Sequence, residues 1–292
     1  MEPVTRRQFF ATAATASGAA ILLAACSDDT QSASDNGASS AAEGSAPVIG
    51  LISSDLYASP NPQRVAFAIA QGASFIDAGD VNVTFKDEAG TVLGTSTASY
   101  HGDGLPKNRG IYVCEATLTS AGTHTIHVET TKGTQPQDTL ASVTPVTSAT
   151  PVNVAAPKAA SPTPTDTLGV QPICTRTPAC TLHEHSLSEV IGNGKPTAVL
   201  FATPARCQSQ YCGPVLDIFL DVLKEPAFAS LQAVHVEIYK DDTSQDLVPT
   251  LDAWHLQSEP WLYCVNADGT IVTRLDGGFD RSEIRAALQK VV

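Results

Sequence analysis

The sequence predicts two domains, an all-β sandwich followed by an α/β domain in which helices flank a central mixed sheet. Residues 47–133 contain short, alternating apolar runs separated by turns rich in Gly, Asp and Pro, a pattern typical of antiparallel strands. Residues 170–292 instead alternate strand-like and helix-like runs, which is typical of an α/β domain. Between them, residues 134–169 are rich in Pro, Thr, Ala and Ser, so we expect an extended interdomain linker.

Length and composition agree with a folded, acidic protein. The chain has 292 residues, of which 42% are hydrophobic and 16% charged, enough for two packed domains with tails. Its formal net charge is −13, and its isoelectric point lies near 4.8. Nucleic acids and anionic lipids repel such a surface, so we expect neither as a partner. The acidic groups are then expected to keep the protein soluble, and we expect a monomer.

The N-terminus carries two adjoining export signals. Arg6 and Arg7 precede Gln-Phe-Phe, as in twin-arginine signals, and the apolar stretch that follows is too short to span a membrane. Leu-Ala-Ala-Cys26 then resembles a bacterial lipobox, in which Cys26 becomes the lipidated first residue. We expect residues 1–25 to be a signal peptide and the protein to be anchored by Cys26 to the extracytoplasmic face of the cell membrane. An uncleaved anchor and a soluble secreted protein are the alternatives.

The segment that follows the lipobox should not fold. Residues 26–46 contain mainly Ser, Ala, Asp and Gly and almost no large apolar side chain, so they cannot bury enough surface to order themselves. We expect a disordered tether between the membrane and the first domain.

The first domain is expected to contain six strands. The run from Gly110 to Val128 looks like the closing hairpin of an immunoglobulin-like sandwich. Only Cys114 lies in this region, so an internal disulfide is excluded, and we expect a spacer or docking module rather than a catalyst. The expected strands are Ile49–Ile52, Val65–Ala70, Val81–Lys86, Thr91–Ala98, Gly110–Thr117 and Gly122–Thr130.

The second domain is expected to follow the order β-α-β-α-β-β-α after a short helical piece. The apolar spacing, the Asn-Ala-Asp-Gly turn at residues 266–269 and the Asp-Arg-Ser-Glu cap at residues 280–283 support this order. The expected elements are Leu187–Ile191, Ala198–Phe201, Val215–Lys224, Ala233–Tyr239, Leu247–Trp254, Trp261–Val265, Thr270–Leu275 and a last helix through Leu288.

A cysteine pair lies between the first expected strand and helix of this domain. Cys207 and Cys212 follow the buried-strand run, and Gly213-Pro214 then opens a segment with helical apolar spacing. A helix N-terminus lowers the pKa of a nearby thiol, and the thiolate is the reactive form. Strand, cysteine pair and helix together predict a redox-active thiol site.

These residues resemble the thioredoxin-like fold over roughly Ser188–Val292. The strand that leads to Cys207, the Cys212-Gly213-Pro214 motif and the Glu259-Pro260-Trp261 segment carry the resemblance. It implies a cis-proline at Pro260 that lines a substrate groove. The neighbouring Trp261 is expected to line this groove or to belong to the core. The chain is also similar to exported bacterial thioredoxin-like lipoproteins with a Thr-Pro-x-x-Cys-x4-Cys-Gly-Pro site, preceded by Cys174-Thr-Arg-x-Pro.

The site departs from the family pattern at three positions. Val215 stands where the second cysteine would follow Cys-Gly-Pro, and Phe201 where the family keeps a buried proton-accepting Asp. Glu259 replaces the usual apolar or Thr residue before the proline. These departures predict a modified thiol site, and a static disulfide that pins the loop to the helix is the alternative.

The five-residue separation of Cys207 and Cys212 constrains their geometry. On one straight helix it corresponds to about 7.5 Å of rise, whereas a disulfide needs Cα atoms within about 7 Å. We therefore expect Cys207 in the loop and Cys212 at the helix start. The helix dipole would then favour Cys212 as the nucleophile, while ungapped alignment with the family makes Cys207 the nucleophile.

The other cysteines and the histidines have less specific patterns. Cys174 and Cys180 flank a Pro-containing loop, and we expect a structural disulfide, with a second redox pair as the alternative. Cys114 and Cys264 are expected to be buried thiols. The histidines at 183 and 185 could bind copper or zinc together with cysteines, and His235 or His255 could serve as a distant copper ligand. Solvated loop histidines are simpler, so we predict no metal site.

The sequence thus predicts a membrane-anchored, extracytoplasmic thiol–disulfide oxidoreductase. Its expected partners are the thiols and disulfides of exported proteins, Cys207 and Cys212 carry the chemistry, and no cofactor is required. The alternatives are a copper-binding metallochaperone of thioredoxin-like fold and a non-catalytic envelope binding protein with structural disulfides.

Overall fold

The computed structural model describes residues 46–72, 74–130, 136–207, 209–241, 243 and 245–292. All of them belong to one unit, Ala41–Val292. The expected signal peptide, the lipidated Cys26 and all of the tether except Ala46 lie outside the described residues.

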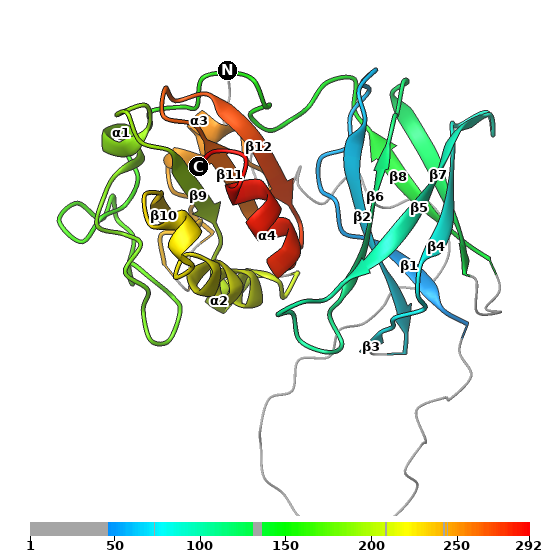
Figure 1. Ribbon diagram of the computed structural model, residues 1–292, viewed down its shortest axis with the longest axis horizontal. Helices are drawn as coiled ribbons and strands as arrows, with labels where there is room; N and C mark the ends of the chain where they lie inside the picture. The colour runs from blue at the N-terminus through cyan, green and yellow to red at the C-terminus, as the bar shows by residue number, and fades with distance from the viewer. Residues whose placement is uncertain (1–45, 73, 131–135, 208, 242, 244) are drawn as a thin grey trace, which may run out of the picture. The chain divides into compact units, whose positions relative to one another are not determined.

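An eight-stranded antiparallel sheet forms the first half of the described chain (Figure 1). Its order is β1-β2-β6-β5-β4-β7-β8, and β3 pairs with β2. The first and last strands of this order, β1 and β8, also contact one another, so the sheet is nearly closed, like a barrel. The strands are β1 (Val48–Leu51), β2 (Gln63–Gln71), β3 (Ser74–Phe75), β4 (Val81–Lys86), β5 (Val92–His101), β6 (Ile111–Ala116), β7 (Gly122–Thr130) and β8 (Gln137–Val143).

Period-two alternation builds the interior of this sheet. Val81, Val83 and Phe85 of β4 are buried, and their neighbours in the strand are more exposed. In β7, Ile126 and Val128 alternate in the same way and join the same apolar cluster. Successive side chains of a strand point to opposite faces, so one face of β4 and of β7 supplies the core and the other is more exposed.

Strand β8 lies where the sequence predicts an extended linker. It pairs with β7 along its whole length, from Gly122 opposite Val143 to Val128 opposite Gln137. Beyond it, the Ala156 amide donates to the Gly269 carbonyl over 2.8 Å. The Pro/Thr-rich segment is therefore packed against the rest of the chain instead of bridging two domains in an extended form.

A four-stranded mixed sheet forms the second half of the chain, in the order β10-β9-β11-β12. β9 and β10 are parallel, whereas β11 runs antiparallel to both β9 and β12. The elements are α1 (Leu187–Val190), β9 (Thr197–Phe201), the 3-10 helix η1 (Pro204–Arg206), α2 (Cys212–Val222), the 3-10 helix η2 (Pro226–Phe228), β10 (Gln232–Val236), α3 (Thr250–Trp254), β11 (Trp261–Val265), β12 (Ile271–Asp276) and α4 (Arg281–Leu288).

The two faces of this sheet are covered by different helices. Leu200 of β9 and Leu262 of β11 belong to the cluster that contains the buried residues of α2 and α4. Val199 and Phe201 face the other way, into the cluster that contains α1 and α3. Ala66 of β2 and Ile111 of β6 join the first cluster, so the eight-stranded sheet packs against the α2 side.

The helices and strands predicted from the sequence agree with the structure better than the predicted fold class does. The strands β4, β7 and β11 have the predicted bounds, and every other predicted helix or strand overlaps an observed one. Two strands, β3 and β8, are not predicted.

The predicted fold class itself is wrong. The protein is mostly β, and its nearly closed eight-stranded sheet replaces the expected immunoglobulin-like sandwich of two sheets. In the part that the structure describes, the four α-helices have only 4, 11, 5 and 8 residues. This helical content is too small for the expected α/β thioredoxin-like domain. The physical reason is that β8, within the segment expected to be a linker, pairs with β7 and contacts β1, so the strands nearly close into one sheet.

None of the helices among the described residues is both long and apolar enough to cross a bilayer.

Candidate functional site

Cys207 and Cys212 form a disulfide with a Cα–Cα distance of 5.7 Å. Cys207 directly follows η1, and Cys212 is the first residue of α2. The loop-to-helix arrangement that the spacing predicts is therefore present. Pro214 lies in the first turn of α2, where its missing amide hydrogen costs no intrahelical hydrogen bond.

The two sulfurs of this disulfide have unequal surroundings. Cys212 is completely buried in the cluster beneath α2, whereas Cys207 is partly exposed. The Cys212 amide at the helix start donates a hydrogen bond to Sγ of Cys207 over 3.1 Å, and the Ser209 hydroxyl lies 3.1 Å from the same sulfur. A helix N-terminus stabilises negative charge, so it would stabilise a thiolate on Cys207 once the disulfide is reduced. The structure therefore favours Cys207 over Cys212 as the nucleophile.

A carboxyl group lies beside the disulfide. One oxygen of Glu259 and the sulfurs of Cys207 and Cys212 all lie within 4.8 Å of one another. Burial raises the pKa of Glu259 to about 7, against the hydrogen bond that the Thr203 amide donates to it over 2.6 Å. A carboxyl with this pKa exchanges protons near neutral pH. Sequence reasoning noticed Glu259 only as a departure from a family pattern, because its approach to the sulfurs is tertiary.

The peptide bond between Glu259 and Pro260 is cis, as the resemblance implies. Pro260 is buried, and Trp261 is 2% exposed, stacked on Tyr263 and hydrogen-bonded through Nε1 to Ser258. The Trp261 side chain thus belongs to the core, which is one of the two positions expected for it.

The second cysteine pair is not bonded, which differs from the predicted structural disulfide. The sulfurs of Cys174 and Cys180 lie 3.8 Å apart. His183 Nε2 and His235 Nδ1 approach the same point, and the four side-chain atoms all lie within 4.8 Å of one another. His183 and His235 are 3% and 0% exposed, so the prediction of solvated histidines is wrong for both. It agrees with His185, whose side chain is 67% exposed.

The other two cysteines among the described residues are the buried thiols that the sequence predicts. Cys114 lies in β6 and Cys264 in β11, both inside apolar clusters. Burial raises the pKa of each thiol to about 12, so neither ionises near neutral pH.

Polar contacts connect the two cysteine pairs. The Thr175 amide and hydroxyl donate to one oxygen of the buried Glu237 over 2.6 and 3.0 Å. The same hydroxyl accepts a hydrogen bond from the Ala205 amide in η1 over 3.2 Å. Thr175 therefore fixes the segment that carries Cys174 against the turn that precedes Cys207.

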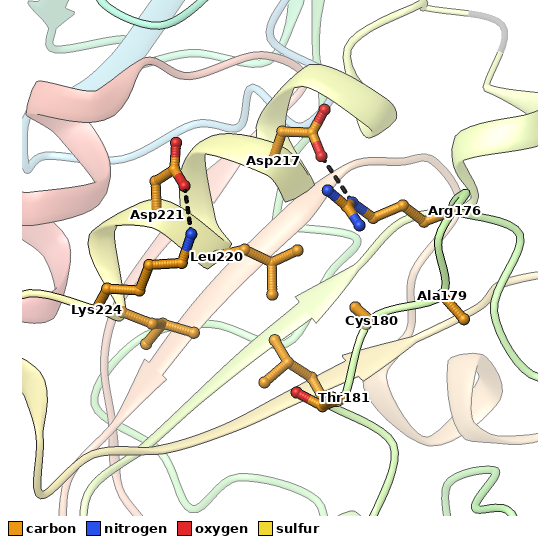
Figure 2. Close-up of a pocket in the computed structure, with 10 residues that line it drawn as sticks. Arg176, Ala179, Cys180, Thr181, Asp217, Leu220, Asp221 and Lys224 are labelled. Atoms are coloured by element: carbon orange, nitrogen blue, oxygen red, sulfur yellow. Dashed lines mark hydrogen bonds and ion pairs between the residues drawn. The ribbon is translucent and has the colours of Figure 1, made fainter.

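A pocket of about 530 Å³ opens beside Cys180 (Figure 2). Residues of α2 form one wall, and the segment around Cys180 forms the other. Arg176 pairs with Asp217 over 2.7 Å, and Lys224 pairs with Asp221 over 2.9 Å at its rim (Figure 2). The disulfide of Cys207 and Cys212 does not line this pocket.

Comparisons with known proteins assign no family. No protein-family model matches the chain, and neither does any curated protein. Among solved structures, a superoxide reductase (neelaredoxin) from Ignicoccus hospitalis matches with a TM-score of 0.22 and 9% identity over 33% of this chain and 78% of that chain. A CARDB domain from Pyrococcus furiosus, in complex with di-metal ions, matches with a TM-score of 0.19 and 15% identity over 38% of this chain and 99% of that chain. Similarities this low carry no functional information.

Proposed function

We propose that this protein carries out thiol–disulfide exchange on exported proteins, with Cys207 as the reacting cysteine and Cys212 as the resolving one. One observation carries the proposal: a partly exposed sulfur, bonded to a fully buried one, accepts a hydrogen bond from the first amide of a helix. The twin-arginine and lipobox motifs support an extracytoplasmic protein anchored through Cys26. In that location the partners would be thiols and disulfides of exported chains.

The exchange begins at the accessible sulfur. A substrate thiolate attacks Sγ of Cys207, a new bond forms between substrate sulfur and Cys207, and the Cys207–Cys212 bond breaks. Cys212 leaves with the electron pair, and protonated Glu259, with an oxygen within 4.8 Å of that sulfur, supplies its proton directly or through one water. Because Cys212 is completely buried, attack from solution is directed to Cys207.

A second substrate thiol completes the oxidation of the substrate. As a thiolate, it attacks the substrate sulfur of the mixed disulfide, and Cys207 leaves as a thiolate that the Cys212 amide stabilises. The substrate loses two electrons and gains a disulfide, and the protein gains two thiols. In reverse, Cys207 attacks a substrate disulfide and Glu259 accepts the proton of Cys212 as it resolves the intermediate. The relative reduction potentials of protein and partner set the direction.

Trapping of the intermediate tests the proposal. The full chain with Cys212→Ser should accumulate mixed disulfides with peptides that carry a disulfide, because nothing resolves them. The matched Cys207→Ser variant should accumulate few mixed disulfides at this pair, since the thiol of Cys212 is buried. Absence of mixed disulfides from both variants would instead indicate a static, structural disulfide, and equal trapping by both would reject Cys207 as the nucleophile.

A further inference from the structure

Four potential metal ligands converge at a second place, apart from the disulfide. Three of them, Cys174, Cys180 and His183, come from the irregular segment before α1, and His235 comes from the middle of β10. Cys174, His183 and His235 are buried, and Cys180 is partly exposed. The proposed exchange reaction uses none of these side chains.

The spacing of the four atoms matches a tetrahedral site. With Zn–S bonds of about 2.3 Å and Zn–N bonds of about 2.0–2.1 Å, tetrahedral geometry places ligand atoms about 3.8 Å apart for two sulfurs, about 3.3 Å for two nitrogens and about 3.6 Å for sulfur and nitrogen. The Cys174 and Cys180 sulfurs lie 3.8 Å apart, and the His183 and His235 nitrogens 3.1 Å apart. The sulfur–nitrogen distances from His235 Nδ1 are 3.9 Å to Cys174 and 3.4 Å to Cys180, and His183 Nε2 lies 3.4 Å from Cys180.

A second hydrogen bond orients one of the imidazoles. His235 Nε2 lies 2.8 Å from the Ala202 carbonyl oxygen, which only accepts, so Nε2 carries the hydrogen. In the neutral ring, Nδ1 then offers its lone pair to the centre of the cluster. Metal-bound histidines are held by this kind of contact between the distal ring nitrogen and a carbonyl. The backbone directly after β9 thereby presents His235 as a ligand.

We infer that Cys174, Cys180, His183 and His235 bind one Zn²⁺ ion in a closed, structural site. Two cysteines and two histidines are a common donor set of structural zinc sites, in which all four positions are filled by protein. Binding would release the two thiol protons to solvent, and the two thiolates would balance the charge of the ion without any oxidation or reduction.

The position of the site indicates what the ion would do. The segment from Gln171 to Ser186 contains no helix and no strand among the described residues. A zinc ion would tie its three ligands to β10 and thereby to the four-stranded sheet. The pocket beside α2 gives access to the site, because Cys180 lines it (Figure 2).

Metal titration of the full chain tests this inference. The protein is reduced without oxygen and titrated with Zn²⁺ in competition with a chelator, and with Co²⁺ as a spectroscopic probe. We expect one Zn²⁺ per chain and, for Co²⁺, thiolate-to-metal charge-transfer absorption with the band pattern of a tetrahedral site. Cys180→Ser and His235→Ala should each weaken Zn²⁺ binding more than about 100-fold, because even changes to residues behind the ligands cost about 10- to 100-fold.

Two controls keep the inference open to refutation. His185→Ala removes an exposed neighbouring imidazole and should leave Zn²⁺ affinity unchanged, as should Cys207→Ser combined with Cys212→Ser, which separates this site from the disulfide. Cys180→Ser is partly exposed and isosteric, so it tests the site even if His235→Ala does not fold. Unchanged affinity in both ligand variants, binding of Cu⁺ without Zn²⁺, or a Cys174–Cys180 disulfide in zinc-supplied protein would overturn the inference.

Discussion

The two cysteine pairs of this protein differ in their bonding, in the backbone that carries them and in their polar neighbours. Cys207 and Cys212 are bonded, lie at a helix start, and have a carboxyl group as their polar neighbour. Cys174 and Cys180 are unbonded, lie in an irregular segment, and have two imidazoles as theirs. The difference lies in the groups around each sulfur. A helix amide and an acid whose pKa is raised to about 7 suit the proposed exchange, whereas nitrogen lone pairs at tetrahedral spacing suit the proposed metal ion.

Removal of one pair at a time should separate the two roles, and this is the largest expected effect. The full chain with Cys207→Ser and Cys212→Ser should lose exchange with a dithiol peptide down to the uncatalysed background. The chain with Cys174→Ser and Cys180→Ser should keep measurable exchange, because its reacting sulfur and helix start are unchanged. Chromatography of the peptide as it oxidises measures the exchange rate of both double variants. Loss of exchange in the variant at residues 174 and 180, but not in the variant at residues 207 and 212, would reverse the roles assigned to the two pairs.

Glu259→Gln should weaken the proton-transfer step of the exchange site. Above pH 7 the carboxylate of Glu259 accepts the Cys212 proton as this residue resolves a mixed disulfide, and Gln cannot do so. Loss of a general base costs about 100- to 10,000-fold, so we expect at least about 100-fold slower resolution at pH 8. In the unmodified protein the resolution rate should rise as the pH rises through about 7, and in the variant this inflection should be absent. Stopped-flow kinetics of a preformed Cys207 mixed disulfide measure the step, and an unchanged inflection would reject the role of Glu259.

The same substitution should alter the pH dependence of stability. The pKa of Glu259 is raised from 4.5 to about 7 by burial, so its contribution to stability is complete below pH 4.5 and is lost as the pH rises through 7. Each unit corresponds to about 1.4 kcal/mol, which gives a loss of about 3 kcal/mol between pH 4 and pH 8. In Glu259→Gln this part of the pH dependence should disappear. Urea unfolding at several pH values measures the free energy of unfolding of both proteins. The same change with pH in both proteins would contradict the raised pKa of Glu259.

Zinc should stabilise the protein through the second pair alone. At a free Zn²⁺ concentration 100 times the dissociation constant, binding to the folded state adds about 2.7 kcal/mol to the free energy of unfolding. A chelator should remove this gain and lower the melting temperature by several degrees. The double Ser variant at residues 207 and 212 should keep the zinc response, and Cys180→Ser should lose it. Loss of the zinc response in the double Ser variant at residues 207 and 212, with the response kept in Cys180→Ser, would show that the ion binds at the disulfide pair instead.

The smallest expected effect concerns the polar contact between the pairs. Thr175→Val keeps the shape of the side chain and removes its hydroxyl, which contacts Glu237 and the Ala205 amide. We expect a loss of about 1 kcal/mol in the free energy of unfolding, the usual value of a hydrogen bond. Thr181→Val at an exposed position is the matched control in the same denaturation assay. Equal effects of the two substitutions would show that the contact contributes nothing.

The local sequence pattern predicts the individual strands and helices of this fold better than it predicts how they pair and pack. Alternation in Val81, Val83 and Phe85 is sufficient to find β4, since its period depends on one face being buried. Most side chains of β8 are small or polar, and the strand lies within a Pro- and Thr-rich segment. Its pairing with β7 is evident only from the folded structure. The contact of β1 with β8 likewise joins the two ends of the sheet, which no local pattern reports.

The same limit applies to the two sites. The spacing of Cys207 and Cys212 with Pro214 places them at a strand-to-helix junction, because that geometry is local. Glu259 approaches them from a distant segment, and His235 lies 52 residues from His183. A cysteine loop alone predicts a disulfide, and only the folded positions of both imidazoles turn the same residues into a candidate metal site.

Selective oxidation tests the central claim, that one pair exchanges disulfides and the other binds metal. The reduced full chain, loaded with one equivalent of Zn²⁺, is equilibrated in glutathione redox buffers, and the oxidation state of each cysteine is mapped by differential alkylation and peptide mass spectrometry. We predict that Cys207 and Cys212 follow the buffer between dithiol and disulfide, while Cys174 and Cys180 stay reduced until a chelator is added. Oxidation of Cys174 and Cys180 in the presence of zinc, or a Cys207–Cys212 pair that does not respond to the buffer, would contradict the account.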